Sequence, residues 1–125
     1  MIHALGVLAS IKPIPYLSVV SNTENRAIGC GATTWRRDVS WILSFYDDTN
    51  YYIEIYDEET ASVAATGLTT TSSPYVHDTG KVGLSGGTGT FHYSEYTVRL
   101  KRVSDDVIVS TMTTPQEFIE SGAPC

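Results

Sequence analysis

The stretch VSWILSFYDDTNYYIEIY, residues 39–56, carries the strongest structural signal in the chain. In its first half, apolar and polar residues alternate, so that one face carries Val39, Trp41, Leu43 and Phe45. In its second half, Tyr51, Ile53 and Ile55 share a face in the same way. Alternation with a period of two is typical of a half-buried β-strand. Because the turn-forming sequence Asp-Asp-Thr-Asn joins the two runs, we predict a β-hairpin.

Short runs of this kind recur along most of the chain, with turn-forming residues between them. Ser21–Asn25 reads as a turn, and 103–107 as a tight acidic turn that closes a hairpin. Further strands are predicted at residues 16–20, 26–34, 62–66, 80–84, 90–93, 96–103 and 107–111. Strands at this spacing with few helices favour a single antiparallel β-sandwich of about eight strands, immunoglobulin-like or jelly-roll in type.

The two ends of the chain differ from this pattern. We predict an extended N-terminal arm at residues 1–15, a β-sandwich domain at 16–113 and a C-terminal tail at 114–125. The tail starts with Thr114, Pro115 and Glu117, which suit the cap, the first position and the third position of a short helical turn over 114–120. The apolar run at residues 4–11 is too short to cross a bilayer, so we expect no membrane partner.

The balance of charge excludes one large class of partner. The chain has 125 residues and a formal net charge of −6, with only 8 Lys and Arg. Phosphate backbones are bound through clustered basic residues, so we expect no nucleic acid partner. The basic pair Arg99 and Lys101 share one face of a late strand, where they form either a solvated face or a contact patch for an acidic partner.

None of the candidate reactive groups forms a catalytic or cofactor motif. The glycine-rich residues 85–89 lack the lysine and the following helix of a phosphate loop, and His3, His77 and His92 are far apart in sequence. We therefore predict no catalytic residue, cofactor or metal. Acidic groups at 47–48, 57–59 and 105–106 suit turn capping, with a calcium site as an alternative. Cys30 and Cys125 are either bridged or two separate thiols.

Outward-facing residues are the remaining candidates for function. Tyr46, Tyr52 and Tyr56 alternate with the apolar residues of their runs, so they should point away from the buried face. Exposed aromatic side chains are enriched in protein interfaces and in sugar-binding platforms. Together with the arm and the basic pair, they give a predicted partner interface of Ile2, Leu5, Val7, Leu8, Ile11, Tyr46, Tyr52, Tyr56, Arg99 and Lys101.

Two stretches resemble the central strands of fibronectin type III and immunoglobulin-like domains. These are YIEIY at 52–56 and EYTVRL at 95–100, with Trp41 in the place of the inner tryptophan. The likeness covers residues 39–111. It departs from the family pattern at Thr90, where a leucine would stand six residues before Tyr96, and in the two glycines of the first predicted sheet. The resemblance implies a sandwich of the immunoglobulin-like type.

In overall profile, this small acidic β-sandwich with an apolar arm and a short tail is similar to phage capsid decoration or cement proteins. That resemblance implies a non-enzymatic virion protein, assembled in the host cytoplasm, which binds and stabilises the outside of a viral head. Its implied partners are the major capsid protein and further copies of itself, as a homodimer or homotrimer. The alternative is a carbohydrate- or surface-binding module of an adhesin or tail fibre.

Overall fold

The computed structural model describes residues 13–24, 34–82 and 91–120, which contain β-strands and no helix. No helix that could cross a membrane is therefore found within these three ranges. The strands are β1 (Leu17–Glu24), β2 (Thr34–Leu43), β3 (Tyr51–Asp57), β4 (Ser62–Leu68), β5 (Tyr75–Val82), β6 (Phe91–Ser94), β7 (Tyr96–Arg102), β8 (Ile108–Thr113) and β9 (Glu117–Glu120).

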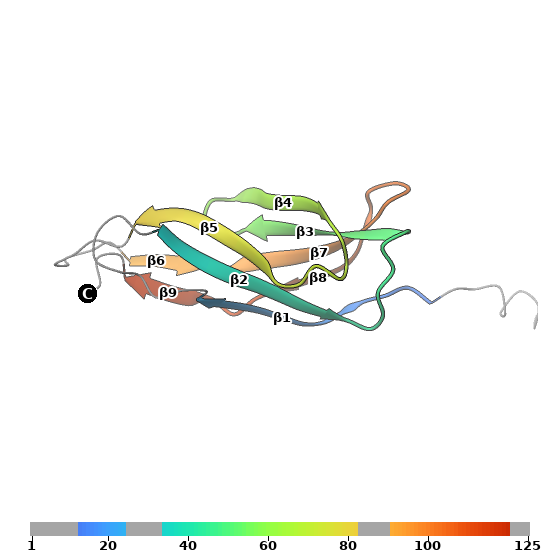
Figure 1. Cartoon of the computed structure of the whole chain (residues 1–125), viewed down its shortest axis with the longest axis horizontal. Helices are drawn as coiled ribbons and strands as arrows, with labels where there is room; N and C mark the ends of the chain where they lie inside the picture. The colour runs from blue at the N-terminus through green and yellow to red at the C-terminus, as the bar shows by residue number, and fades with distance from the viewer. Residues whose placement is uncertain (1–12, 25–33, 83–90, 121–125) are drawn as a thin grey trace, which may run out of the picture.

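The strands form two main antiparallel sheets, which are stacked on each other in a β-sandwich-like fold (Figure 1). One sheet has the order β1-β2-β5, and the other has the order β4-β3-β7-β8. A short third sheet, β6-β9, extends the β7 and β8 ribbon beyond Glu95. On one side of the stack β1 lies next to β8, where the Leu17 N–H donates to Ser110 Oγ at 3.0 Å.

The hydrophobic core lies between the two main sheets, and each sheet supplies half of it. The buried apolar side chains of this cluster are Leu17, Val20, Val39, Trp41 and Leu43 from the first sheet, and Ile53, Ile55, Tyr96, Val98 and Leu100 from the second. Alternate residues of a strand point to one face, so their burial leaves the intervening residues on the outer faces. The alternation predicted for 39–43 and 51–55 is confirmed in this respect.

The hairpin predicted for residues 39–56 is wrong. β2 pairs with β1 and β5, whereas β3 pairs with β4 and β7. Residues 44–50 carry the chain from one sheet to the other, so the apolar faces of the two runs meet across the core. Asp48 fixes this crossover by accepting from the backbone N–H and the hydroxyl of Thr70, at 2.5 and 2.6 Å. The turn residues predicted a reversal correctly, but a reversal does not determine which strand becomes the neighbour.

Two hairpins whose turns lie among the described residues join neighbouring strands, and acidic turn residues were predicted at both turns. β7 pairs with β8 through residues 103–107, where Asp106 adopts a φ of +60°. β3 pairs with β4 through a turn in which the Asp57 carboxylate accepts from the N–H groups of Glu59 and Thr60. These local pairings follow from acidic turn residues whose side chains bind the backbone.

Three predictions about strand ends are wrong for the same reason. Ser21–Glu24 is not a turn but the second half of β1, paired with β2. β5 begins at Tyr75 rather than at Gly80. In place of the helical turn predicted over 114–120, residues 117–120 form β9 and pair with β6. In each case pairing with a distant strand outweighs local propensity, which is a weak determinant on its own. The arm up to residue 12, the loop at 85–89 and both cysteines lie outside the described residues.

Candidate functional site

The outer face of the four-stranded sheet brings together aromatic and charged side chains from its two central strands. Tyr52, Glu54 and Tyr56 alternate along β3, and Arg99 and Lys101 alternate along β7. The antiparallel register places Tyr52 opposite Lys101 and Glu54 opposite Arg99. Side chains of directly opposed residues project to the same side of a sheet, so these five form one surface. We call it the β3–β7 face.

Glu54 lies at the centre of the β3–β7 face. Its carboxylate accepts a hydrogen bond from Lys101 Nζ at 2.9 Å and lies 3.8 Å from Arg99 Nη1. Although Glu54 is on the outer side of the sheet, only 5% of it is exposed. The hydrogen bond to Glu54 raises the pKa of Lys101, which keeps this amine charged. Arg99 and Lys101 thus place two positive charges around the Glu54 carboxylate, and the Asp106 carboxylate lies beside Tyr52 at the edge of the face.

The two tyrosine rings are each associated with one of these cations. The guanidinium of Arg99 lies 4.3 Å from the centroid of the Tyr56 ring, and Lys101 Nζ lies 5.6 Å from that of Tyr52. Both distances are within the range of cation–π attraction. The Tyr52 hydroxyl donates to Asp106 Oδ1 at 2.8 Å, and partial burial, followed by this bond, raises the pKa of Tyr52. The side chains are thus held in fixed positions before any partner binds.

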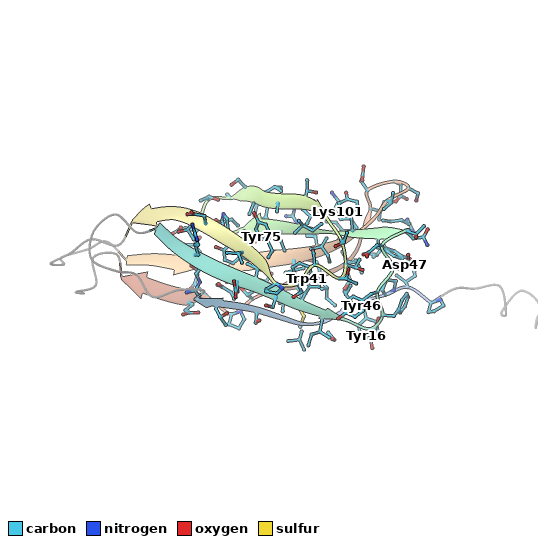
Figure 2. The ribbon with its side chains drawn as sticks, in the orientation of Figure 1. Tyr16, Trp41, Tyr46, Asp47, Tyr75 and Lys101 are labelled. Carbon is cyan, nitrogen blue, oxygen red and sulfur yellow. The ribbon has the colours of Figure 1, made fainter. Side chains whose placement is uncertain are left out.

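The structure gathers four of the ten predicted interface residues on this face: Tyr52, Tyr56, Arg99 and Lys101. Tyr46 is separate from them, because it lies in the crossover that follows β2 (Figure 2). The predicted residues of the arm, Ile2 to Ile11, are outside the described ranges. Glu54 was missed, although it lies two residues from both Tyr52 and Tyr56 and was therefore predictable as a residue of the same face. Asp106 was missed because its contact depends on the pairing of β3 with β7.

The acidic turns hold their own backbone. Asp47 accepts from the N–H groups of Thr49 and Asn50, and Asp48 binds Thr70. Asp105 accepts two hydrogen bonds from the Arg102 guanidinium, at 2.9 and 2.8 Å. Hydrogen bonds lower the pKa of all three carboxyls. In the part of the chain that is described, no group of three potential ligand side chains is placed to hold a metal ion.

His77 lies in a polar region of the core. Its Nδ1 is 2.9 Å from the Tyr96 hydroxyl and 3.9 Å from Asp57 Oδ2. Burial lowers the pKa of His77, and the nearby charges of Asp57 and Asp78 oppose that effect. Burial also raises the pKa of Tyr96. Asp78, its neighbour in sequence, projects to the other side of β5, with its carboxylate 3.7 Å from Arg36 Nε.

One surface cleft is lined by Pro13, Asp47, Asn50, Tyr51, Arg102 and Ser104. Its volume of about 210 Å³ is below the roughly 300–1,000 Å³ of typical ligand pockets. The charged groups that line it are also engaged, since Arg102 binds Asp105 and Asp47 binds Asn50. It is a poor candidate for a small-molecule site compared with the β3–β7 face.

Comparison with protein-family models, with curated proteins and with solved structures found no match for this chain.

Proposed function

We propose that the sandwich is of the immunoglobulin-like type rather than a jelly roll. Support comes from the order of the seven main strands, β1-β2-β5 in one sheet and β4-β3-β7-β8 in the other. An immunoglobulin constant domain has the same order except that its fourth strand joins the first sheet. Here β4 pairs with β3, which is the arrangement of fibronectin type III domains.

We further propose that this protein is a non-enzymatic decoration protein that binds the outside of a viral head. The observation that carries the proposal is the β3–β7 face, where two tyrosines, an arginine and a lysine are held in a fixed array. Tyrosine and arginine are enriched in protein interfaces and among the residues that contribute most to binding energy. The Arg99 and Lys101 side chains can donate charged hydrogen bonds to carboxylates exposed on a capsid surface.

The geometry of the rings favours a protein partner over a glycan. A sugar-binding platform presents the open face of an aromatic ring, whereas here Arg99 covers one face of Tyr56 and Lys101 lies over Tyr52. Glu54 in turn holds Lys101, so removing the cation from the ring would break a hydrogen bond of 2.9 Å. A partner that meets the edges of this array needs no such rearrangement.

In this proposal the N-terminal arm contributes a second contact. The arm carries the apolar residues Ile2, Leu5, Val7, Leu8 and Ile11, and β-strand addition to a neighbouring subunit is a common use of such segments. Binding through both a fixed sheet face and an arm would reinforce a shell by burial alone. Repetition around the shell would multiply the effect of each contact.

Binding to phage heads prepared without this protein tests the proposal. We expect the Tyr56→Ala, Arg99→Ala double variant to bind at least tenfold more weakly, because it removes the central pair of the face. The control is Arg36→Ala, an exposed arginine of the other sheet, which should change binding less than twofold. Deletion of residues 1–12 should also weaken binding. Failure of the unaltered protein to bind heads would refute the proposal, and loss of sugar binding on Tyr52→Ala would favour the glycan-binding alternative.

A further inference from the structure

The two cations of the β3–β7 face differ in how their hydrogen-bond donors are used. Lys101 Nζ donates to Glu54 Oε2 at 2.9 Å, whereas Arg99 Nη1 lies 3.8 Å from Glu54 Oε1. A separation of 3.8 Å is too long for a hydrogen bond. Within residues 13–24, 34–82 and 91–120, no acceptor is hydrogen-bonded to the Arg99 guanidinium. Its N–H groups are therefore available to an added ligand.

Arg99 is nevertheless held in place on the sheet. Its guanidinium lies 4.3 Å from the centroid of the Tyr56 ring, and its side chain is only 27% exposed. Arg36 makes an ion pair of similar length with Asp78, at 3.7 Å, but its side chain is 47% exposed. Water is thus already excluded from much of Arg99, and the ring contact restricts its rotation. A ligand loses less free energy in binding to such a group than to an arginine that is free in solvent.

The neighbouring strand β8 adds two side chains to the surroundings of Arg99. Thr111 is exposed and is the direct partner of Arg99 in the β7–β8 register, so its hydroxyl lies on the same side of the sheet. Ile108 is the partner of Lys101 and is 46% exposed. A guanidinium and a hydroxyl beside an exposed apolar side chain suit both parts of an acidic residue, its carboxylate and its methylene stem.

We propose that Arg99 is the binding site for the carboxylate of an acidic side chain on the partner protein. The planar guanidinium donates two parallel hydrogen bonds to the two carboxylate oxygens, a geometry that the Lys101 amine cannot offer. Lys101, whose amine is bonded to Glu54, acts as a positioning residue. This inference rests on the proposed function, because it names the group of the partner that the β3–β7 face recognises.

The acidic residues around Arg99 favour a carboxylate over a phosphate group as the ligand. Glu54 lies beside Arg99, Asp106 accepts from the Tyr52 hydroxyl, and Glu58 accepts from the hydroxyl of Thr97, two residues before Arg99 on β7. These carboxylates repel any anion that approaches the face. A phosphate group carries a charge of about −1.5 to −2 at pH 7 and is repelled more strongly than a carboxylate of charge −1.

Titration of the full chain with sodium acetate, followed by NMR, tests the site without any partner. We expect the Arg99 Nε–H and the Thr111 amide signals to shift and saturate, in contrast to a titration with sodium chloride of the same ionic strength. Arg99→Lys keeps the charge but loses the planar group, and it should weaken acetate binding about fivefold or more at the Thr111 signal. The control Arg36→Lys makes the same change on the other sheet and should leave acetate binding unchanged.

A variant that strengthens binding separates the proposed role from a loss of folding. Glu54→Gln removes a negative charge beside Arg99 but keeps an acceptor for Lys101. It should strengthen acetate binding about threefold or more, because repulsion of the ligand is reduced. Weaker acetate binding by Glu54→Gln would overturn the proposal. Equal shifts in acetate and in chloride would also overturn it, as would tighter binding of inorganic phosphate than of acetate.

Head binding distinguishes a failure of this inference from a failure of the decoration function. Arg99→Lys should bind heads about fivefold more weakly or worse. If it binds them as well as the unaltered protein while the Tyr56→Ala, Arg99→Ala variant does not, the carboxylate site is wrong and the decoration function stands. Saturable binding of acetate at Arg99 in a protein that does not bind heads would support the site and refute the decoration function.

Discussion

Arg37 on β2 is joined to Glu117 on β9 by an ion pair of 2.5 Å, although Arg37 itself is only 1% exposed. The Arg37 Nε also donates to Asn22 Oδ1 at 2.8 Å, and the Asn22 amide in turn donates to Ser94 O at 3.0 Å. This chain of contacts connects β2 of the first sheet with both strands of the short β6-β9 sheet. A buried guanidinium is stable only when its donors are paired, so Glu117 and Asn22 are requirements of the fold.

Replacing Arg37 should therefore be costly. Arg37→Met leaves the buried Oδ1 of Asn22 without its donor, and we expect a loss of about 2–3 kcal/mol in the free energy of unfolding, below the range for a fully buried pair because Glu117 can reach water. The control is Arg36→Met, which removes an exposed contact to Asp78 and should cost less than about 0.5 kcal/mol. Urea unfolding measures both, and similar losses for the two arginines would contradict the role assigned to Arg37.

The hydroxyl of Thr70 should contribute to stability, whereas that of its neighbour should not. Thr70 is fully buried, and its hydroxyl donates to Asp48 Oδ1 at 2.6 Å. Thr70→Val keeps the shape but removes this bond, and we expect a loss of about 1–2 kcal/mol. Thr71→Val removes an exposed bond of 3.2 Å and should change stability little. Thermal unfolding of the two variants tests this prediction. Equal melting temperatures for Thr70→Val and Thr71→Val would contradict it.

Acid should destabilise the fold in two separate pH ranges. Burial lowers the pKa of His77 below its ordinary value of 6.5, so the unfolded chain binds more protons at His77 just below that pH. The contribution of His77 to the free energy of unfolding is thus fully present above about pH 6.5. It falls as the pH decreases toward the pKa of His77 in the folded chain, by at most about 1.4 kcal/mol per pH unit for one proton. Asp47, Asp48 and Asp105 have lowered pKa values, and their contributions are lost only at lower pH, below about 5.

Comparison with His77→Gln isolates the contribution of the histidine. The variant should show a flatter dependence of melting temperature on pH between 7 and 5.5, and the same decline as the unaltered protein below pH 5. The other two histidines are present in both proteins, so their contributions cancel. Parallel curves across the upper range would rule out His77 as the cause of the loss.

Disulfide trapping tests the assignment of β2 and β3 to different sheets. Asp38 and Val76 are direct partners in the β2–β5 register, on the outer side of the sheet. A cysteine pair at these positions, with the two native cysteines replaced by serine, should oxidise readily because the Cβ separation suits a disulfide. A pair at Ser44 and Tyr52, which a hairpin over residues 39–56 would bring together, should not. Oxidation of the pair at Ser44 and Tyr52, but not of the pair at Asp38 and Val76, would support the hairpin instead.

The sequence predicted which faces are buried better than it predicted which strands are neighbours. Alternation identified the inward residues Val39, Trp41, Ile53 and Ile55, because burial of one face is a local property of each strand. It could not show that β2 and β3 lie in different sheets, since that depends on β5 and β7. The same limit explains β9, where a cap sequence that suits a helix is overridden by pairing with β6.

For the candidate site, the alternation of side chains along a strand was sufficient to group Tyr52 with Tyr56 and Arg99 with Lys101. Placing the two groups on one surface required the β3–β7 register, which no residue pattern reveals. Arg37 was missed as a buried residue because it follows Arg36 in a sequence that reads as a solvated pair. Only the positions of Asn22 and Glu117 make its burial favourable.

The crossover between β2 and β3 also has a consequence for how quickly the chain folds. The hairpins β3–β4 and β7–β8 can form from nearby residues, but the sandwich closes only when Val39 meets Tyr75 and Ile53 meets Leu100. Pairings between such distant residues lose loop entropy before they gain contact energy. Folding dominated by them takes on the order of milliseconds to seconds, whereas isolated hairpins form in roughly 1–10 microseconds. β4 and β8, which contain no charged residue, are the edge strands of the four-stranded sheet, and their exposure to other chains during that interval would lead to aggregation on refolding at high concentration.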